Sequence, residues 1–271
     1  MLIRVYLGII SLLLPLMATA MENNTVRLAV VNTPYQSGLM AYLLEGFEEQ
    51  SEMTVELYHG EDVYQRAEQG KADLVIAHYG KEPLAHFVME GYGSWPKMVF
   101  SNQLVIVGPA DDPAAIGGLS SASAAFGQIA SGGHPFVVNN IAGLNYLTEI
   151  LWSAAGKPTK TEWYRDSGLA KGQAMKAADK DHAYTVWGAI PFLTFKQKQQ
   201  TDLIILVSQD PLLQRVMAVT RVNPDKIAGV NAEGAKQLEA YLLKPETQAK
   251  IAAFRGDNLP MQLWWPAGRH N

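Results

Sequence analysis

The side chains best suited to bind a ligand lie in a polar turn near the start of the chain. Its donors and acceptors are Asn32, Thr33, Tyr35, Gln36 and Ser37. A short apolar strand is expected before the turn and a helix after it, so backbone N–H groups at the helix start point towards whatever lies above. Amides, hydroxyls and free N–H groups together suit an anion or a small polar ligand. The alternative is an ordinary strand-to-helix connection in which Ser37 caps the helix.

Later turns and strand ends offer similar chemistry. The further candidate ligand-binding residues are Asn139, Asn140, Asn145, Ser167, Gly168 and Trp187. The three asparagines could donate amide hydrogen bonds, although Asn is also an ordinary turn residue. Ser167 and Gly168 could offer a hydroxyl and backbone N–H groups. Trp187 could form the apolar wall of a pocket, as aromatic residues often do, or could pack in the core.

Patterns for catalysis and for metal binding are weak in this sequence. Ser37 with His78 is the one nucleophile–base pair that can be suggested, and no G-x-S-x-G motif supports it. The six histidines are scattered, with no H-E-x-x-H and no pair at helical spacing. We therefore expect neither an enzyme nor a metal or other cofactor, and interpret His78 as a structural residue at the end of a strand.

Composition narrows the class of protein further. The chain has 271 residues, of which 48% are hydrophobic and 18% charged, as is ordinary for a globular protein with a sizeable core. Its formal net charge of −4 argues against nucleic acid or an anionic membrane surface as a partner. It has no cysteine, so no disulfide can support the fold.

The first 20 residues read as an export signal. Arg4 supplies one positive charge, an apolar run follows over 5–17, and the small residues Ala18 and Ala20 suit a cleavage site. The run is too short to span a bilayer comfortably. We expect a mature periplasmic protein that begins at Met21, and the absence of cysteine argues against a lipid anchor.

Strands and helices alternate along the rest of the chain, which predicts an α/β fold. Strands are expected at 26–31, 53–58, 73–77, 100–108, 136–139, 183–186, 203–207 and 214–221, and helices at 39–49, 62–69, 81–90, 144–155, 173–178, 231–243 and 246–255. A short helix and a loop are expected within 117–133. Turn clusters near 109–113 and 211 predict two lobes, with residues 21–108 and 211–271 in lobe 1 and 109–210 in lobe 2. The strands' carboxyl ends should bring the polar turns and His78 to one rim.

Several motifs in this order carry a resemblance to a known family. They are QSGL (36–39), GKADLVIAH (70–78), LVIVGPADDPAAI (104–116), EWYRDSG (162–168), DLIILVSQDPLL (202–213) and VNPDKIAGVNAEGAK (222–236). Over residues 26–255 the chain resembles the periplasmic tungstate-binding proteins of ABC importers. The resemblance implies the two-lobed type II periplasmic binding protein fold, each lobe a mostly parallel sheet flanked by helices. It also implies delivery of tungstate or molybdate to a membrane permease. We expect the protein to be a monomer.

The binding loops depart from the pattern of that family. Asn139 and Ala189 stand where the family places arginines, which would give charge-assisted bonds to an oxyanion. We therefore expect weak tungstate binding or none, and a less charged, partly apolar ligand beside Trp187. Two functions stay open: an importer's solute-binding protein, or a sensing subunit that binds another small molecule for a membrane receptor. The Trp264–Trp265 tail is expected to pack on lobe 1.

Overall fold

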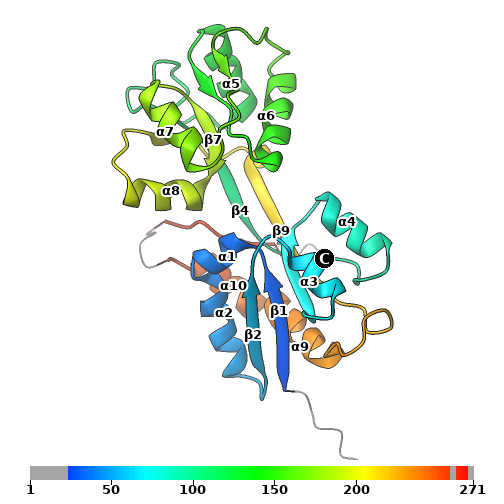
Figure 1. The fold of residues 1–271 in the computed structure, drawn as a ribbon. Helices are drawn as coiled ribbons and strands as arrows, with labels where there is room; N and C mark the ends of the chain where they lie inside the picture. Colours follow the sequence, from blue (N-terminus) through cyan, green and yellow to red (C-terminus); the bar gives the residue numbers. More distant parts are fainter. Residues whose placement is uncertain (1–23, 257–260, 268–271) are drawn as a thin grey trace, which may run out of the picture.

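Two long antiparallel strands connect the two lobes of the molecule (Figure 1). They are β4 (Lys97–Gly108) and β9 (Gln214–Arg221), and we call them the hinge strands. The structure is a computed structural model in which residues 24–256 and 261–267 are described. The expected export signal lies outside these residues. Among the helices described, none combines the length and the apolar character that a membrane span needs.

Lobe 1 is built on a sheet in which three parallel strands adjoin the hinge strands. The parallel strands are β1 (Thr25–Val30), β2 (Thr54–His59) and β3 (Leu74–His78). Strand β3 pairs antiparallel with β9, and the short β10 (Trp265–Pro266) pairs with β4. The helices of this lobe are α1 (Asn32–Gln36), α2 (Leu39–Glu48), α3 (Val63–Glu68), α4 (Glu82–Met89), α9 (Ala232–Leu243) and α10 (Pro245–Ala253).

Lobe 2 surrounds the far end of β4. Strands β7 (Thr185–Gly188) and β8 (Ile204–Val207) pair antiparallel with β4, and β5 (Phe136–Val137) pairs parallel with β6 (Tyr164–Arg165). Its helical segments are α5 (Ala122–Ser131), α6 (Ala142–Ala154), α7 (Gly172–Lys180), α8 (Ala189–Lys198) and the 3₁₀ turn η1 (Pro211–Leu213).

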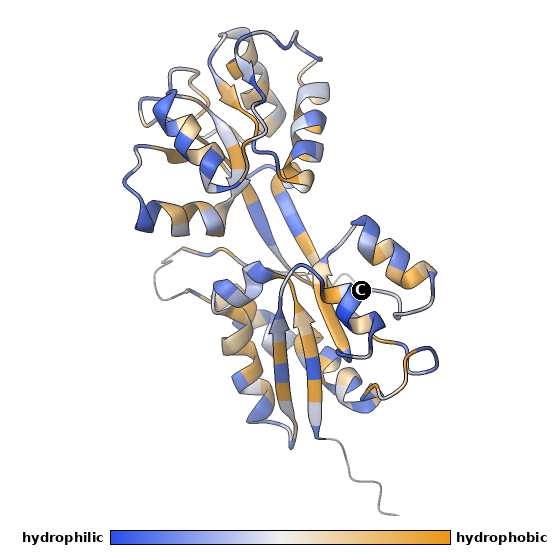
Figure 2. Ribbon diagram, viewed as in Figure 1, coloured by the Kyte–Doolittle hydropathy of each residue, from blue (hydrophilic) through white to orange (hydrophobic). Residues whose placement is uncertain are grey.

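The alternation of side chains along β4 builds the core of lobe 2 on both faces of the strand. Leu104 and Ile106 pack with residues of α5 and α6, whereas Val105 and Val107 pack with residues of α7 and α8. Between the lobes both hinge strands become hydrophilic (Figure 2), because Asn102 and its neighbours replace this apolar pattern. Polar groups are thus carried into the space between the lobes.

The α/β fold expected from the sequence is confirmed, although some of its details differ. The strand directions are more mixed than the family pattern implies, because both hinge strands must cross between the lobes in opposite directions. The polar turn after β1 forms a single helical turn, α1. Helix α8 was not predicted; its Pro191 lies in the first helical turn, where proline is tolerated. The C-terminal tail does pack on lobe 1, with Trp264 fully buried against Phe100.

Candidate functional site

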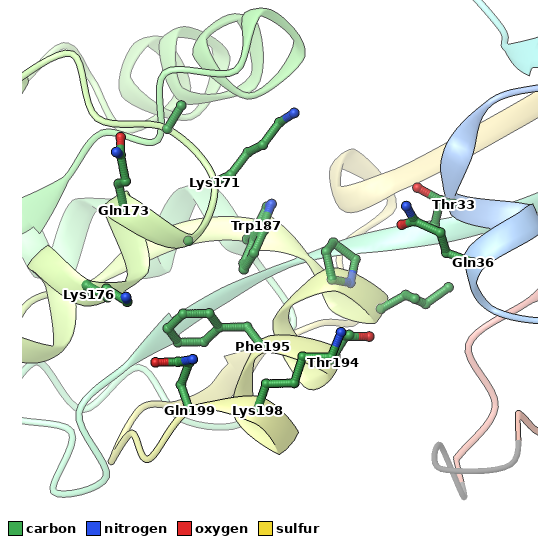
Figure 3. A pocket seen from close by; sticks show the side chains of 14 residues that line it. Thr33, Gln36, Lys171, Gln173, Lys176, Trp187, Thr194, Phe195, Lys198 and Gln199 are labelled. Atoms are coloured by element: carbon green, nitrogen blue, oxygen red, sulfur yellow. The ribbon is translucent and has the colours of Figure 1, made fainter. Parts of the chain in front are cut away.

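A cleft of about 1080 Å³ separates α1 of lobe 1 from α7 and α8 of lobe 2. Figure 3 shows Thr33 and Gln36 on one side of it and Lys171, Trp187 and other residues of lobe 2 on the other. Trp187 is half-buried, and its ring meets Phe195 edge-on at 6.1 Å between centroids. The cleft therefore has a polar wall from lobe 1 and a mixed aromatic and cationic wall from lobe 2.

A smaller space lies where this cleft meets the hinge strands, and we call it the hinge cavity. Its volume is about 140 Å³. The residues that matter for its chemistry are Thr33, His78, Asn102, Gly143, Trp187 and Arg215. They come from lobe 1, from lobe 2 and from both hinge strands. Drug-sized ligands need roughly 300–1,000 Å³, so the hinge cavity suits an ion of a few heavy atoms.

The strand register explains why these groups share one side of the sheet. In the antiparallel pairing of the hinge strands, Asn102 is opposite Arg215. His78, the last residue of β3, is opposite Met217. Residues opposite each other, and residues two apart on one strand, point to the same face. His78, Asn102 and Arg215 are therefore presented together at the floor of the cleft.

The hinge cavity has an electropositive character. Burial first, and then the charges of Arg215 and Lys81, lower the pKa of His78 to about 3, so its imidazole is neutral at physiological pH. Burial also lowers the pKa of Arg215, which nevertheless stays charged because a guanidinium titrates far above neutrality. Nδ1 of His78 and Oδ1 of Asn102 are buried without hydrogen-bond partners. The cavity offers one fixed cation beside unpaired polar atoms.

The residues of the polar turn divide between the cleft and the body of lobe 1. Thr33 lines both the cleft and the hinge cavity, and Gln36 lines the cleft. Asn32 instead holds His59, with 3.0 Å between Oδ1 and Nδ1, and the ring of Tyr35 stacks on the same histidine at 3.6 Å between centroids. Asn32 and Tyr35 thus both contact His59 on β2, and neither of them lines the hinge cavity.

Ser37 is used inside lobe 1. Its side chain is only 8% exposed, donates a hydrogen bond to the carbonyl of Pro34 and accepts one from Nε1 of Trp264. The residue at the start of α2 is Gly38, which has a left-handed backbone conformation. Ser37 therefore ties the polar turn to Trp264, the residue directly before β10.

Asn139 forms two hydrogen bonds that close the core of lobe 2. Its amide nitrogen donates to the carbonyl of Val186 at 3.3 Å, and its oxygen accepts from the backbone N–H of Lys171 at 2.8 Å. The side chain is 2% exposed. It holds together the end of β5, the strand β7 and the loop before α7, and it lies outside the residues lining the hinge cavity.

The other candidates of lobe 2 form a small surface network. Asn140 donates to Asp166 at 2.9 Å and accepts from Asn145 at 3.2 Å. The N–H of Gly168 reaches the same Asp166 carboxylate at 3.3 Å, and Ser167 is exposed. Of the eleven predicted site residues, the structure brings Thr33 and Trp187 together in the hinge cavity, with Gln36 in the adjoining cleft.

Sequence reasoning missed Asn102 and Arg215. Both lie in long strands, whereas the sequence-based prediction placed ligand-binding residues only in turns and at strand ends. The available signal was the polar run Gln214–Arg215 at the start of an otherwise apolar strand, since a charged residue in a buried strand needs a reason.

Comparison with known proteins identifies the family. The chain is 34% identical over 249 residues to a protein of Haloferax volcanii named as an ABC transporter anion-binding protein, a match that covers 88% of this chain and 71% of that protein. The chain belongs to the family of ABC transporter anion-binding proteins. It is also 29% identical over 253 residues to the tungstate-binding protein TupA of Peptoclostridium acidaminophilum, covering 89% of this chain and 85% of TupA. No protein-family model matches the sequence.

Solved structures agree with this membership. The tungstate ABC transporter structure from Geobacter sulfurreducens has a TM-score of 0.70 at 28% identity, over 85% of this chain and 98% of that one. The tungstate-binding protein TupA from Desulfovibrio alaskensis G20 has a TM-score of 0.76 at 23% identity, over 89% of this chain and 98% of that one, and so shares the fold. These neighbours thus share the fold of this chain over most of its length.

Proposed function

We propose that the protein is a periplasmic solute-binding protein that captures a small inorganic oxyanion in the hinge cavity and presents it to the permease of an ABC importer. The observation that carries this proposal is the convergence of Thr33, Trp187 and Arg215 on one small cavity. These residues come from lobe 1, lobe 2 and a hinge strand, so one ion can contact all three parts.

Capture by closure follows from this arrangement. An ion held by groups of both lobes has more contacts when the lobes are close together than when they are apart. It therefore shifts the population towards the closed form by its difference in affinity for the two states. A permease that recognises the closed form would then engage only the loaded protein.

Tungstate and molybdate are the first ligands to test, because two relatives carry tungstate in their names. The loops lack the arginines that the sequence comparison expects at 139 and 189. Arg215 supplies a cation from the hinge instead. We therefore expect measurable tungstate binding, in place of the weak binding that the loops alone predict. The sensing alternative finds no specific support in the structure.

Titration calorimetry of the exported protein with tungstate, molybdate, sulfate, amino acids and small carboxylates tests the ligand. We expect saturable binding of at least one oxyanion and none of the amino acids. A ligand at about 100 times its Kd should also stabilise the fold by about 2.7 kcal/mol in thermal unfolding. Binding of an organic ligand alone would overturn the proposal.

The importer role has a test of its own. Deletion of the gene should abolish high-affinity uptake of the oxyanion identified by calorimetry, and the cloned gene should restore it. Unchanged uptake, together with a changed transcriptional response to the same ion, would favour the sensing alternative.

A further inference from the structure

A second cation, Lys81, lies beside Gly143, which lines the hinge cavity. A methyl group placed on Gly143 would lie 2.9 Å from Nζ of Lys81 and 3.0 Å from Nη2 of Arg215. The two charges are therefore at most about 6 Å apart, within the range in which like charges disfavour each other strongly. Lys81 and Arg215 also line one shared pocket of about 180 Å³ with Gly143.

Neither cation has a neutralising partner among residues 24–256 and 261–267. No carboxylate of that part of the chain lies within 4.0 Å of Lys81 or Arg215. Burial and then the charge of Arg215 lower the pKa of Lys81, and burial lowers the pKa of Arg215. The ligand-free protein thus holds two half-buried like charges together, an arrangement that costs free energy unless an anion neutralises it.

The start of α6 adds to the positive potential at the same point. Helix α6 has 13 residues, and Ile141 before it provides no side-chain acceptor. The N–H groups of Leu144 and Asn145 turn back to the carbonyl of Ile141, while those of Ala142 and Gly143 have no backbone acceptor in the part of the chain that is described. A helix N-terminus attracts anions through its free N–H groups and its dipole.

We propose that Lys81, Arg215 and the N-terminus of α6 form a subsite for a divalent oxyanion, which takes over the role of the arginines absent from the loops. The inference rests on the proposed function and adds the charge of the ligand and the residues that recognise it. His78 supplies the independent sign of a ligand, because it lines the hinge cavity and its Nδ1 atom is buried there without a hydrogen-bond partner.

The three groups of this subsite belong to different parts of the molecule. Lys81 is on lobe 1 before α4, Gly143 is on lobe 2, and Arg215 is on a hinge strand. Without an anion, the repulsion between Lys81 and the positive end of α6 opposes closure of the lobes. A divalent anion between them attracts both groups and so replaces this repulsion with attraction. Closure of the lobes therefore depends on the charge of the ligand.

Tungstate and perrhenate provide a direct test, because both are tetrahedral oxyanions of similar size that differ in charge. By calorimetry, the wild-type protein should bind tungstate much more tightly than perrhenate. Arg215→Gln and Lys81→Gln should each weaken tungstate binding by roughly 10- to 150-fold, the range for loss of a charged hydrogen bond. They should weaken perrhenate binding less, so that the preference for the divalent ion shrinks.

Lys236→Gln is the matched control, since it removes one exposed positive charge from α9, which lines neither the cleft nor the subsite. Its tungstate affinity should stay within about twofold of wild type, as for an exposed charge screened by salt. Arg215→Lys keeps the charge but not the planar fork, and we expect an intermediate loss. The melting temperatures of the ligand-free Arg215→Gln and Lys81→Gln proteins should not be lower than that of the wild type, because each substitution removes a like-charge repulsion.

The outcomes separate this inference from the proposed function. If the wild-type protein binds no oxyanion of the panel, the proposed function fails. If it binds tungstate and both variants bind equally well, the proposed function stands and the subsite is overturned. Equal loss of tungstate and perrhenate in Arg215→Gln, with a lowered melting temperature before ligand is added, would show a structural role and would also overturn the subsite.

Discussion

The hydroxyl of Ser37 accepts a hydrogen bond from the indole N–H of Trp264 at 3.1 Å, across 227 positions of the sequence. Both groups are buried, and Trp264 also meets Phe100 edge-on at 5.1 Å. The contact fastens the polar turn, and with it Thr33 of the hinge cavity, to the segment directly before β10. Ser37, which the sequence offers as a ligand donor, therefore supports the geometry of lobe 1 instead.

The Ser37–Trp264 bond predicts a measurable coupling in stability. Ser37→Ala leaves the buried indole N–H without a partner, so the free energy of unfolding should fall by about 1–3 kcal/mol. Trp264→Phe removes the donor but also a large buried ring, so its own cost is higher. A double-mutant cycle by urea unfolding should show that Ser37→Ala costs little once Trp264 is Phe. Lost tungstate binding with unchanged stability in Ser37→Ala would instead make Ser37 a ligand donor.

Asn139 is a second predicted ligand-binding residue to which the structure gives a structural role. Asn139→Ala would leave the N–H of Lys171 and the carbonyl of Val186 unpaired inside lobe 2, and should lower the free energy of unfolding by about 2 kcal/mol or more. Asn140→Ala is the control, since its bonds to Asp166 and Asn145 lie nearer the surface and should be worth less. Urea unfolding measures both. An Asn139→Ala protein of normal stability that binds no tungstate would contradict the structural role.

The sequence predicts the elements of this protein better than it predicts the contacts of its side chains. Strand β9 begins and ends at the expected residues, because its apolar pattern is local. Helix α8 escapes prediction because Pro191 and its lysine-rich end hide the helical period. The partners of the polar turn could not be predicted, since His59 and Trp264 reach Asn32 and Ser37 only through tertiary packing.

Arg215 shows the same limit at the site itself. Its position in a strand is readable, but its approach to Gly143 depends on how two lobes are placed about the hinge. The loops alone therefore suggested that the protein lacks positive charge for an oxyanion. The sequence does not show that Arg215 of β9 lies beside the start of α6, because that contact forms only in the folded protein.

His78 predicts a specific dependence of stability on pH. Its pKa is lowered from 6.5 to about 3 in the folded protein, first by burial and then by Arg215 and Lys81. As the pH falls from 6.5 towards 3, the unfolded chain binds a proton at this residue that the folded chain does not. The contribution of His78 to stability is therefore retained above pH 6.5 and lost progressively in that window.

Comparison of the wild-type protein with His78→Gln isolates this effect from the titration of carboxylates. Urea unfolding at about pH 7.5 and about pH 4.5 should show a smaller loss of stability in the variant, because it has no imidazole to protonate on unfolding. Equal losses in both proteins would mean that the folded imidazole titrates near its ordinary pKa and is not held neutral in the cavity.

Gly143 tests the position of the anion by space rather than by charge. Gly143→Ala would place a methyl group 2.9 Å from Nζ of Lys81 and 3.0 Å from Nη2 of Arg215. Both atoms are the ends of flexible side chains, so they can move and the fold should survive. The methyl group would occupy the point on which the cations converge, and tungstate affinity should fall about tenfold, or about 1.4 kcal/mol.

Gly127→Ala in α5 is the matched control for this substitution. Its added methyl group meets only Cβ of Ala155, at 3.7 Å, an ordinary contact within lobe 2. The control should unfold at the same or a slightly higher denaturant concentration, as Gly-to-Ala changes in helices do, and should bind tungstate normally. If Gly143→Ala also binds normally while Arg215→Gln does not, the ion lies on the Thr33 and Asn102 side of Arg215. The hinge cavity would then hold the ligand without help from Lys81 or the start of α6.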